Sequence, residues 1–340
     1  MQVPLLDLRL QYQSLKDSLQ PLLGELFDSQ QFILGPHVLT LEQNIADYCG
    51  ASYAVGVTSG TDALLLALMA IDVQPGDKVI TTPYTFFATA GSIARLGGIP
   101  VFVDIDPETY TMDPQQVENL LAASSDQDRE KIKAIMPVHL YGQCADMQPI
   151  LDVARKYNLK VIEDAAQALG AAYLLDGKAT KACARGDFGC LSFFPSKNLG
   201  CFGDGGMITT NDDRIARKLR SLRVHGQTEG YYHEYIGING RLDALQALVL
   251  QVKLPYLDGW AARRKSNAAY YEKLFTEAGL LDYVVPPRTR TGATHVYNQF
   301  VVRVRERDGL KQHLDKQGIG TAIYYPLPLH LQTCFKYLGY

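Results

Sequence analysis

The chain has 340 residues, of which 47% are apolar, and a formal net charge of −3. This composition is typical of a globular protein with a substantial core, and it gives no reason to expect binding to nucleic acid or to an anionic membrane. The N-terminal residues lack the features of a signal peptide and no run reaches the roughly 18 apolar residues of a membrane span, so we expect a cytoplasmic protein.

A strand–turn–helix unit is the first informative element. The strand-like run 53–57 leads into Ser59, Gly60 and Thr61, and a strongly helical segment follows at 63–70. Backbone N–H groups at a helix start are unpaired and favour an anion, so this turn is a candidate phosphate site. Ordinary helix capping by Ser and Thr explains the same residues, and the turn alone does not decide between the two.

A second apolar strand, 159–164, ends in Asp164 and passes into small residues. In open α/β sheets the carboxyl edge of the strands is where ligands bind, and a carboxylate there can keep the nitrogen of a pyridine ring protonated. Helix capping is the alternative explanation for this aspartate.

Lys197 follows another strand-like run and enters a turn rich in small residues. An amine against apolar side chains loses its charge more readily than one in water, and a neutral amine can form a Schiff base with an aldehyde such as pyridoxal phosphate (PLP). Most lysines are solvated surface charges, so the neighbouring motifs decide this interpretation. Cys201 lies close by but has no adjacent histidine, and we expect it to be structural.

Metal binding is not expected, because the histidines are scattered singly and the six cysteines lack C-x-x-C spacing. The same spacing argues against a disulfide framework. Apolar runs and helical stretches alternate from about 54 to 210, which predicts a mostly parallel sheet with helices on both faces. Polar, small residues predict surface loops at 122–130 and 174–185.

Helical patterns return at 212–224 and at 242–273, the second with a kink expected at Pro255. A smaller lobe follows, with a strand predicted at 299–304 and a helix at 310–317. We expect a large domain over residues 1–250 and a small α+β domain over 251–340.

Ten segments, taken in this order, are the basis for a family resemblance. They are Gln31–Pro36, Val57–Leu64, Gly76–Ala90, Pro100–Asp106, Pro137–Gly142, Glu163–Ala168, Ser192–Gly200, Gly203–Gly206, Gly237–Asp243 and Tyr325–His330. Together they resemble the DegT-like nucleotide-sugar aminotransferases, a branch of the fold-type I PLP enzymes. Family members run some tens of residues past the last segment, so the small domain looks truncated here.

The resemblance implies a role for each matching residue. Lys197 would bind PLP as an internal aldimine and move the proton during catalysis, with pyridoxamine phosphate (PMP) as the second cofactor form. Asp164 would pair with the pyridine nitrogen, and Gln167 would contact the 3-hydroxyl side of the ring. Gly60, Thr61 and Ser192 would bind the phosphate. Phe86 would stack on the ring, with Tyr84 or Phe87 as alternatives. Packing in the hydrophobic core is the competing explanation for these three aromatic residues.

Three further positions concern substrate, again by resemblance alone: His139, His330 and Tyr325. Asn239, between glycines in a turn, would reach the phosphate of the neighbouring subunit, so the active form would be a homodimer. An asparagine beside glycines is also a common turn former.

The implied reaction moves an amino group from L-glutamate to a keto group of a nucleotide-linked sugar. We favour C3 of a UDP-linked 3-keto sugar over C4 of a dTDP-, UDP- or GDP-linked 4-keto sugar. Lysine at position 197 argues against a sugar dehydratase, which has histidine there. The remaining alternatives are another fold-type I enzyme, such as an amino-acid aminotransferase or a desulfurase, and a PLP-binding regulator without turnover.

Overall fold

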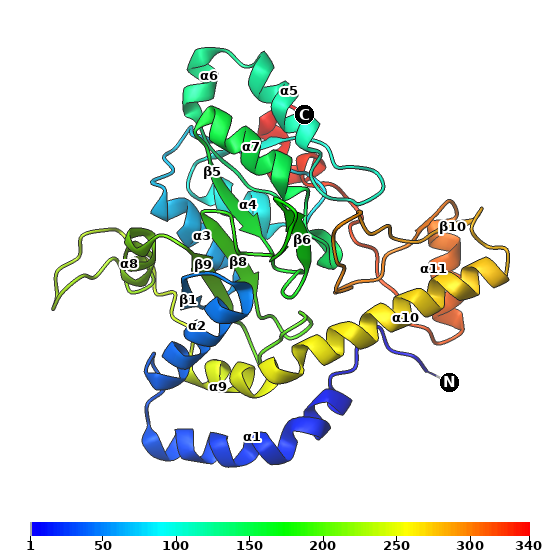
Figure 1. Cartoon of the computed structure of the whole chain (residues 1–340), viewed down its shortest axis with the longest axis horizontal. Helices are drawn as coiled ribbons and strands as arrows, with labels where there is room; N and C mark the ends of the chain where they lie inside the picture. Colours follow the sequence, from blue (N-terminus) through cyan, green and yellow to red (C-terminus); the bar gives the residue numbers. More distant parts are fainter. Residues whose placement is uncertain (1) are drawn as a thin grey trace.

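The computed structural model describes residues 2–340 and is built around one large sheet (Figure 1). Its seven strands are, in spatial order, β1 (Tyr53–Val57), β9 (Gly206–Thr210), β8 (Phe188–Ser192), β5 (Lys160–Asp164), β4 (Ile132–Ile135), β2 (Lys78–Thr81) and β3 (Ile99–Phe102). The five strands from β8 to β3 are parallel, whereas β9 is antiparallel to both of its neighbours. Strand β1 therefore points the same way as the parallel strands.

Helices cover both faces of the sheet because both faces are apolar. Successive side chains point to opposite sides, so Val161 and Ile162 of β5 belong to two separate hydrophobic cores. One core includes α3 (Gly60–Ala70), α4 (Ala88–Arg95) and α8 (Asp213–Leu222). The other includes α2 (Pro36–Cys49), α5 (Pro114–Ala123), α7 (Met147–Tyr157) and α9 (Ala244–Lys253). The predicted α/β class is confirmed.

A long helix connects the sheet to the C-terminal part of the chain (Figure 1). Helix α9 ends at Lys253, a 3₁₀ turn (η2, Leu254–Tyr256) contains Pro255, and α10 (Leu257–Glu277) continues, which confirms the predicted break. The remaining elements are α1 (Arg9–Ser29), which packs on α9, the small sheet of β10 (Val284–Val285) and β11 (Arg303–Val304), α11 (Arg307–Lys316), and the 3₁₀ turns η1 (Leu140–Gly142), η3 (Leu329–Leu331) and η4 (Thr333–Leu338).

Three local predictions differ from the structure. The loop expected at 122–130 contains a short helix, α6 (Asp126–Lys131), which buries no side chain and so has no apolar periodicity; Ser125 caps it. The loop expected at 174–185 contains a hairpin of β6 (Ala172–Leu175) and β7 (Lys178–Lys181), joined by Asp176 and Gly177. Both turn residues have positive φ, the geometry for which Asp-Gly is favoured.

The strand expected at 299–304 is reduced to Arg303 and Val304, because only these two residues pair with β10. The domain boundary predicted at 250/251 falls inside α9 and stays a prediction. Within residues 2–340, none of the helices combines the length and apolarity that a membrane crossing requires.

Candidate active site

Four of the predicted residues meet at one edge of the sheet. Asp164 is the last residue of β5, Ser192 is the last residue of β8, and Lys197 lies in the loop that follows β8. Gly60 opens α3 just after β1. Because β1, β5 and β8 point in the same direction, their carboxyl ends lie on the same side, as the predicted site requires.

The turn before α3 lies against the end of β8. Gly206, the first residue of β9, is paired with both Val57 of β1 and Ser192 of β8, which sets the two strand ends level. A Cβ atom on Gly60 would lie only 2.6 Å from Cβ of Ser192, so only glycine fits at this approach. Ser59 caps the helix through Asp62 N at 3.0 Å. The capping explanation thus holds for Ser59, while Gly60 and Ser192 lie close together at the positive end of α3, where an anion is favoured.

Asp164 is a buried carboxylate held by two donors. The Thr89 hydroxyl donates to Oδ2 at 2.8 Å, and the backbone N–H of Ala166 donates to Oδ1 at 3.2 Å. Burial raises the pKa of Asp164, and these hydrogen bonds and the nearby charge of Lys197 only partly oppose it. Within residues 2–340 no ion pair neutralises this carboxylate. A protonated ring nitrogen would supply the missing opposite charge.

Lys197 is partly buried in a tight turn, with its backbone N–H donating to Phe194 O at 2.8 Å. Burial lowers the pKa of its amine, and the charge of Asp164 opposes that shift. No residue in the described range 2–340 forms a hydrogen bond or ion pair with its Nζ. An unpartnered amine with a depressed pKa is the form that attacks an aldehyde.

Gln167 connects the sheet edge to the C-terminal part of the chain. Its Oε1 accepts from the backbone N–H of Tyr141 at 2.6 Å, and its Nε2 donates to the hydroxyl of Tyr325 at 3.0 Å. The hydroxyls of Tyr84 and Tyr141 lie 3.0 Å apart, and both donate to the carbonyl of Tyr324. Burial raises the pKa values of Tyr141 and Tyr325, so both phenols stay protonated at neutral pH.

His139 lies beneath this edge and is fully buried. Its Nε2 is 2.9 Å from Oε2 of Glu163, and its Nδ1 accepts from the backbone N–H of Ala145 at 3.2 Å. Burial alone would raise the pKa of Glu163, but the bonds from His139 and from the N–H groups of Gly186 and Cys183 outweigh it and lower that pKa. Both ring nitrogens are thus engaged, which leaves neither for a substrate in this geometry.

The other predicted residues lie at more exposed positions. Phe86 is 56% exposed and lies in the irregular segment between β2 and α4. Phe87 packs against Phe335 instead. Asn239 is exposed in the segment after α8, which extends away from the sheet in Figure 1. His330 lies in η3 against Phe102, and its buried Nδ1 has no partner within residues 2–340.

Sequence reasoning missed two residues at this edge. Thr89 was not recognised as a partner of Asp164, although it lies in one of the family-like segments. Tyr141 was also missed as a member of the tyrosine cluster. Positive φ at this residue was not visible from the sequence, because tyrosine rarely adopts it.

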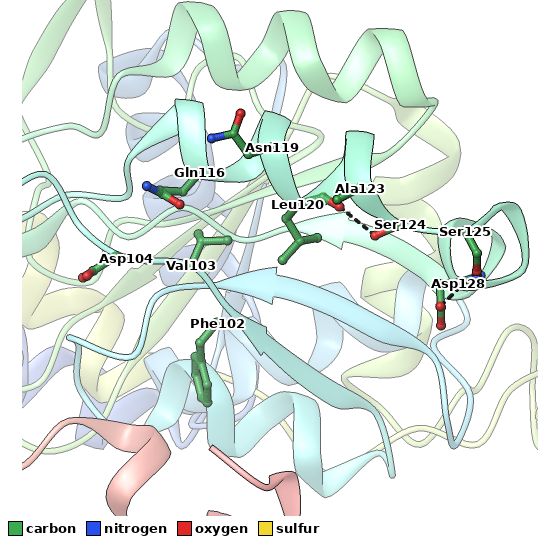
Figure 2. Close-up of a pocket in the computed structure, with 10 residues that line it drawn as sticks. All are labelled: Phe102, Val103, Asp104, Gln116, Asn119, Leu120, Ala123, Ser124, Ser125 and Asp128. Carbon is green, nitrogen blue, oxygen red and sulfur yellow. Dashed lines mark hydrogen bonds between the residues drawn. The ribbon is translucent and has the colours of Figure 1, made fainter.

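An open cavity lies elsewhere. Figure 2 shows it between β3, α5 and the turn before α6, with a volume of about 610 Å³. Its lining residues are Phe102, Val103, Asp104, Gln116, Asn119, Leu120, Ala123, Ser124, Ser125 and Asp128. None of the residues predicted to bind the cofactor lines it.

These features together fit a PLP-binding site. A glycine at a helix N-terminus suits a phosphate, a buried carboxylate without an ion-pair partner suits a basic ring nitrogen, and an unpartnered lysine amine suits an aldehyde. The model of the DegT/DnrJ/EryC1/StrS aminotransferase family matches residues 13–340, and the chain belongs to this family. PLP is the cofactor of these enzymes.

Individual relatives cover nearly the whole chain. A "pleiotropic regulatory protein" of Geobacillus stearothermophilus is 52% identical over 100% of this chain and 88% of its own length. A UDP-N-acetyl-3-dehydro-α-D-glucosamine 3-aminotransferase of Acidithiobacillus ferrooxidans is 42% identical over 98% of this chain and 87% of its own. The crystal structure of DesV from S. venezuelae superposes with a TM-score of 0.91 at 39% identity, covering 98% of this chain and 86% of that one.

Proposed function

We propose that the protein transfers the amino group of L-glutamate to the C3 keto group of a UDP-linked 3-keto sugar. The glutamate α-carbon is oxidised to the ketone of 2-oxoglutarate, and the sugar carbon is reduced to an amine, so the exchange needs no external oxidant. The observation that carries this proposal is the unpartnered amine of Lys197 beside the buried carboxylate of Asp164. The 3-aminotransferase relative supports the choice of C3 and of UDP.

Each residue has a defined task in this reaction. When bound, PLP supplies an aldehyde that takes up the amino group and a ring that stabilises negative charge on the adjacent carbon. Asp164 would keep the ring nitrogen protonated, because its own negative charge is otherwise unbalanced. Gly60, Thr61 and Ser192 would hold the phosphate, and the Lys197 amine would carry the proton between the reacting carbons. Gln167 would contact the PLP ring while its Nε2 holds the hydroxyl of Tyr325.

A homodimer completes this proposal. Asn239 is exposed and makes no side-chain hydrogen bond within residues 2–340. In the same segment Tyr231 and Ile236 are 91% and 94% exposed. A second subunit would cover this surface and receive Asn239 at its phosphate site.

Two experiments test the chemistry. Borohydride reduction of the PLP-loaded protein followed by peptide mapping should place the label on Lys197, and a label elsewhere would overturn the mechanism. Glutamate should then be consumed with a UDP-3-keto sugar, and turnover with 4-keto sugars alone would establish C4 amination instead. A regulator without turnover, which the name of the 52% identical relative makes worth testing, would bind PLP but leave glutamate unchanged.

Subunit mixing tests the dimer. Lys197→Ala and Asn239→Ala should each be inactive alone, but a mixed dimer should regain activity if Asn239 acts across the interface. Such a dimer holds one site in which both residues are intact. No recovery on mixing, with mixed dimers demonstrated by mass, would place Asn239 in its own subunit's site or outside the site altogether.

A further inference from the structure

Helix α9 holds the loop of Lys197 through two side chains on one face. Gln246 and Lys253 lie two helical turns apart. Gln246 accepts from Phe202 N at 2.7 Å and donates to Phe202 O at 3.3 Å. Lys253 donates from Nζ to the carbonyl of Gly200 at 2.5 Å. The two side chains therefore hold adjacent parts of the segment that closes the loop.

Lys253 is an unusual residue for such a contact, because its side chain is only 2% exposed. Its ammonium lies 4.5 Å from the ring centroid of Phe202, a cation–π contact. No carboxylate in the described part of the chain pairs with it. A buried ammonium without a counter-ion is costly, whereas an apolar side chain of similar size is not.

The loop that Lys253 contacts is folded tightly around Lys197. A Cβ on Gly200 would lie 2.3 Å from the carbonyl oxygen of Pro195, so the two ends of the turn touch. Cys201 N donates to Phe193 O at 2.8 Å and ties the end of the turn to the residue that follows β8. Asn298 also donates to Ser196 O at 3.3 Å, within the turn. The Gly200 carbonyl and the Cys201 N–H belong to the same peptide group, so a donor that fixes this carbonyl also fixes the end of the turn.

We propose that Lys253 is a positioning residue for Lys197, holding the Gly200 carbonyl so that the turn presents the Lys197 amine toward Asp164. The proposal rests on the function proposed for Lys197, but the contact itself belongs to the protein without cofactor. A charged donor makes a stronger hydrogen bond to a carbonyl than a neutral amine does. The charge state of Lys253 should therefore control how firmly the loop is held.

The pH range of this effect follows from the surroundings of Lys253. Burial lowers its pKa to about 8. Burial raises the pKa of Cys201 to about 11, so this thiol stays neutral while Lys253 titrates. The charge of Asp204, in the same loop, helps to raise the pKa of Cys201. The ring of Tyr12 in α1 packs edge-on against the ring of Phe202. The charge on Lys253 is present below about pH 8 and is lost above it.

Hydrogen exchange on the cofactor-free protein tests the proposal directly. In Lys253→Met the protection factor of the peptide covering residues 193–206, calculated with the intrinsic exchange rates, should fall at least tenfold. The protection factors of peptides from α3 and β5 should not change. The wild type should show the same loss between pH 7 and 9.5. Lys265→Met, on the exposed surface of α10, is the matched control and should change neither. Lys253→Arg, which stays charged, should retain protection at pH 9.5.

Kinetics of the PLP-loaded protein give a second, independent result. Lys253→Met should lower kcat at least tenfold with little change in KM for glutamate, and the alkaline decline of kcat near pH 8 should disappear. Unchanged protection and an unchanged pH profile in Lys253→Met would overturn the proposal, as would a loss of protection spread equally over α3 and β5. If that variant does not fold, the wild-type pH dependence and Lys253→Arg decide. If the wild type does not transaminate, the proposed function fails while the exchange result still stands.

Discussion

Glu42 and Arg223 form a buried ion pair beneath the phosphate turn, and its removal gives a quantitative test of how the site is supported. Their side chains are in contact, and the residues are only 4% and 5% exposed. Oε1 of Glu42 accepts from Gly56 N at 2.8 Å, and Nη1 of Arg223 donates to Gly56 O at 2.9 Å. The Arg223 carbonyl also accepts from Gly240 N at 2.9 Å, next to Asn239.

The expected energies follow from the charges left behind. Glu42→Gln leaves a buried guanidinium without a counter-charge, and Arg223→Met leaves a buried carboxylate, so each should destabilise the protein by about 3–5 kcal/mol. The double variant leaves no charge, and its glutamine can still accept from Gly56 N. Its cost should be about 1–3 kcal/mol, the cost of leaving Gly56 O without a donor. The double variant should therefore be more stable than either single one.

Urea unfolding of the cofactor-free protein measures these differences, because bound cofactor would itself shift the stability. Trp260, the single tryptophan, reports on α10 by fluorescence, and circular dichroism reports on the whole chain. The fluorescence and circular dichroism unfolding curves must coincide before a free energy of unfolding is assigned. Asp213→Asn, which breaks an exposed pair with Arg217, is the control and should cost about 0.5 kcal/mol or less. Additive single effects, or single losses below about 1 kcal/mol, would refute the reasoning.

Three further predictions concern the site itself. Asp164→Asn should retain PLP but lower transamination by about 100-fold or more, since an amide cannot balance a protonated ring nitrogen; near-normal turnover would refute the role of Asp164. Gly60→Ala should weaken PLP binding at least tenfold, measured by cofactor titration, because the new methyl group would meet Ser192 at 2.6 Å, whereas Gly259→Ala, with open space around it, should not. Acetylation of the cofactor-free protein should reach its plateau rate at a lower pH for Lys197 than for exposed Lys265, because burial lowers the pKa of Lys197; equal profiles would show that the amine is solvated.

Local signals in the sequence were sufficient to predict those parts of the candidate site that lie within single segments. The strand at 53–57, the turn at Gly60 and the helix after it appear as predicted, because each depends on neighbouring residues. Asp164 ends β5 for the same reason. The short polar helix α6 and the Asp176–Gly177 hairpin were missed, since neither has a buried apolar face long enough to show periodicity.

The sequence by itself determined the α/β fold class and placed Asp164 at the end of one strand and Lys197 shortly after another, because apolar periodicity and strand ends are local properties. Only the tertiary structure decided which distant residues hold them in place. Ser192 meets Gly60 because both neighbouring strand ends pair with Gly206, and Lys253 reaches Gly200 because α9 packs below the loop. Burial and charge pairing depend on contacts across the whole chain, so these supporting residues carry no signal in their own segments.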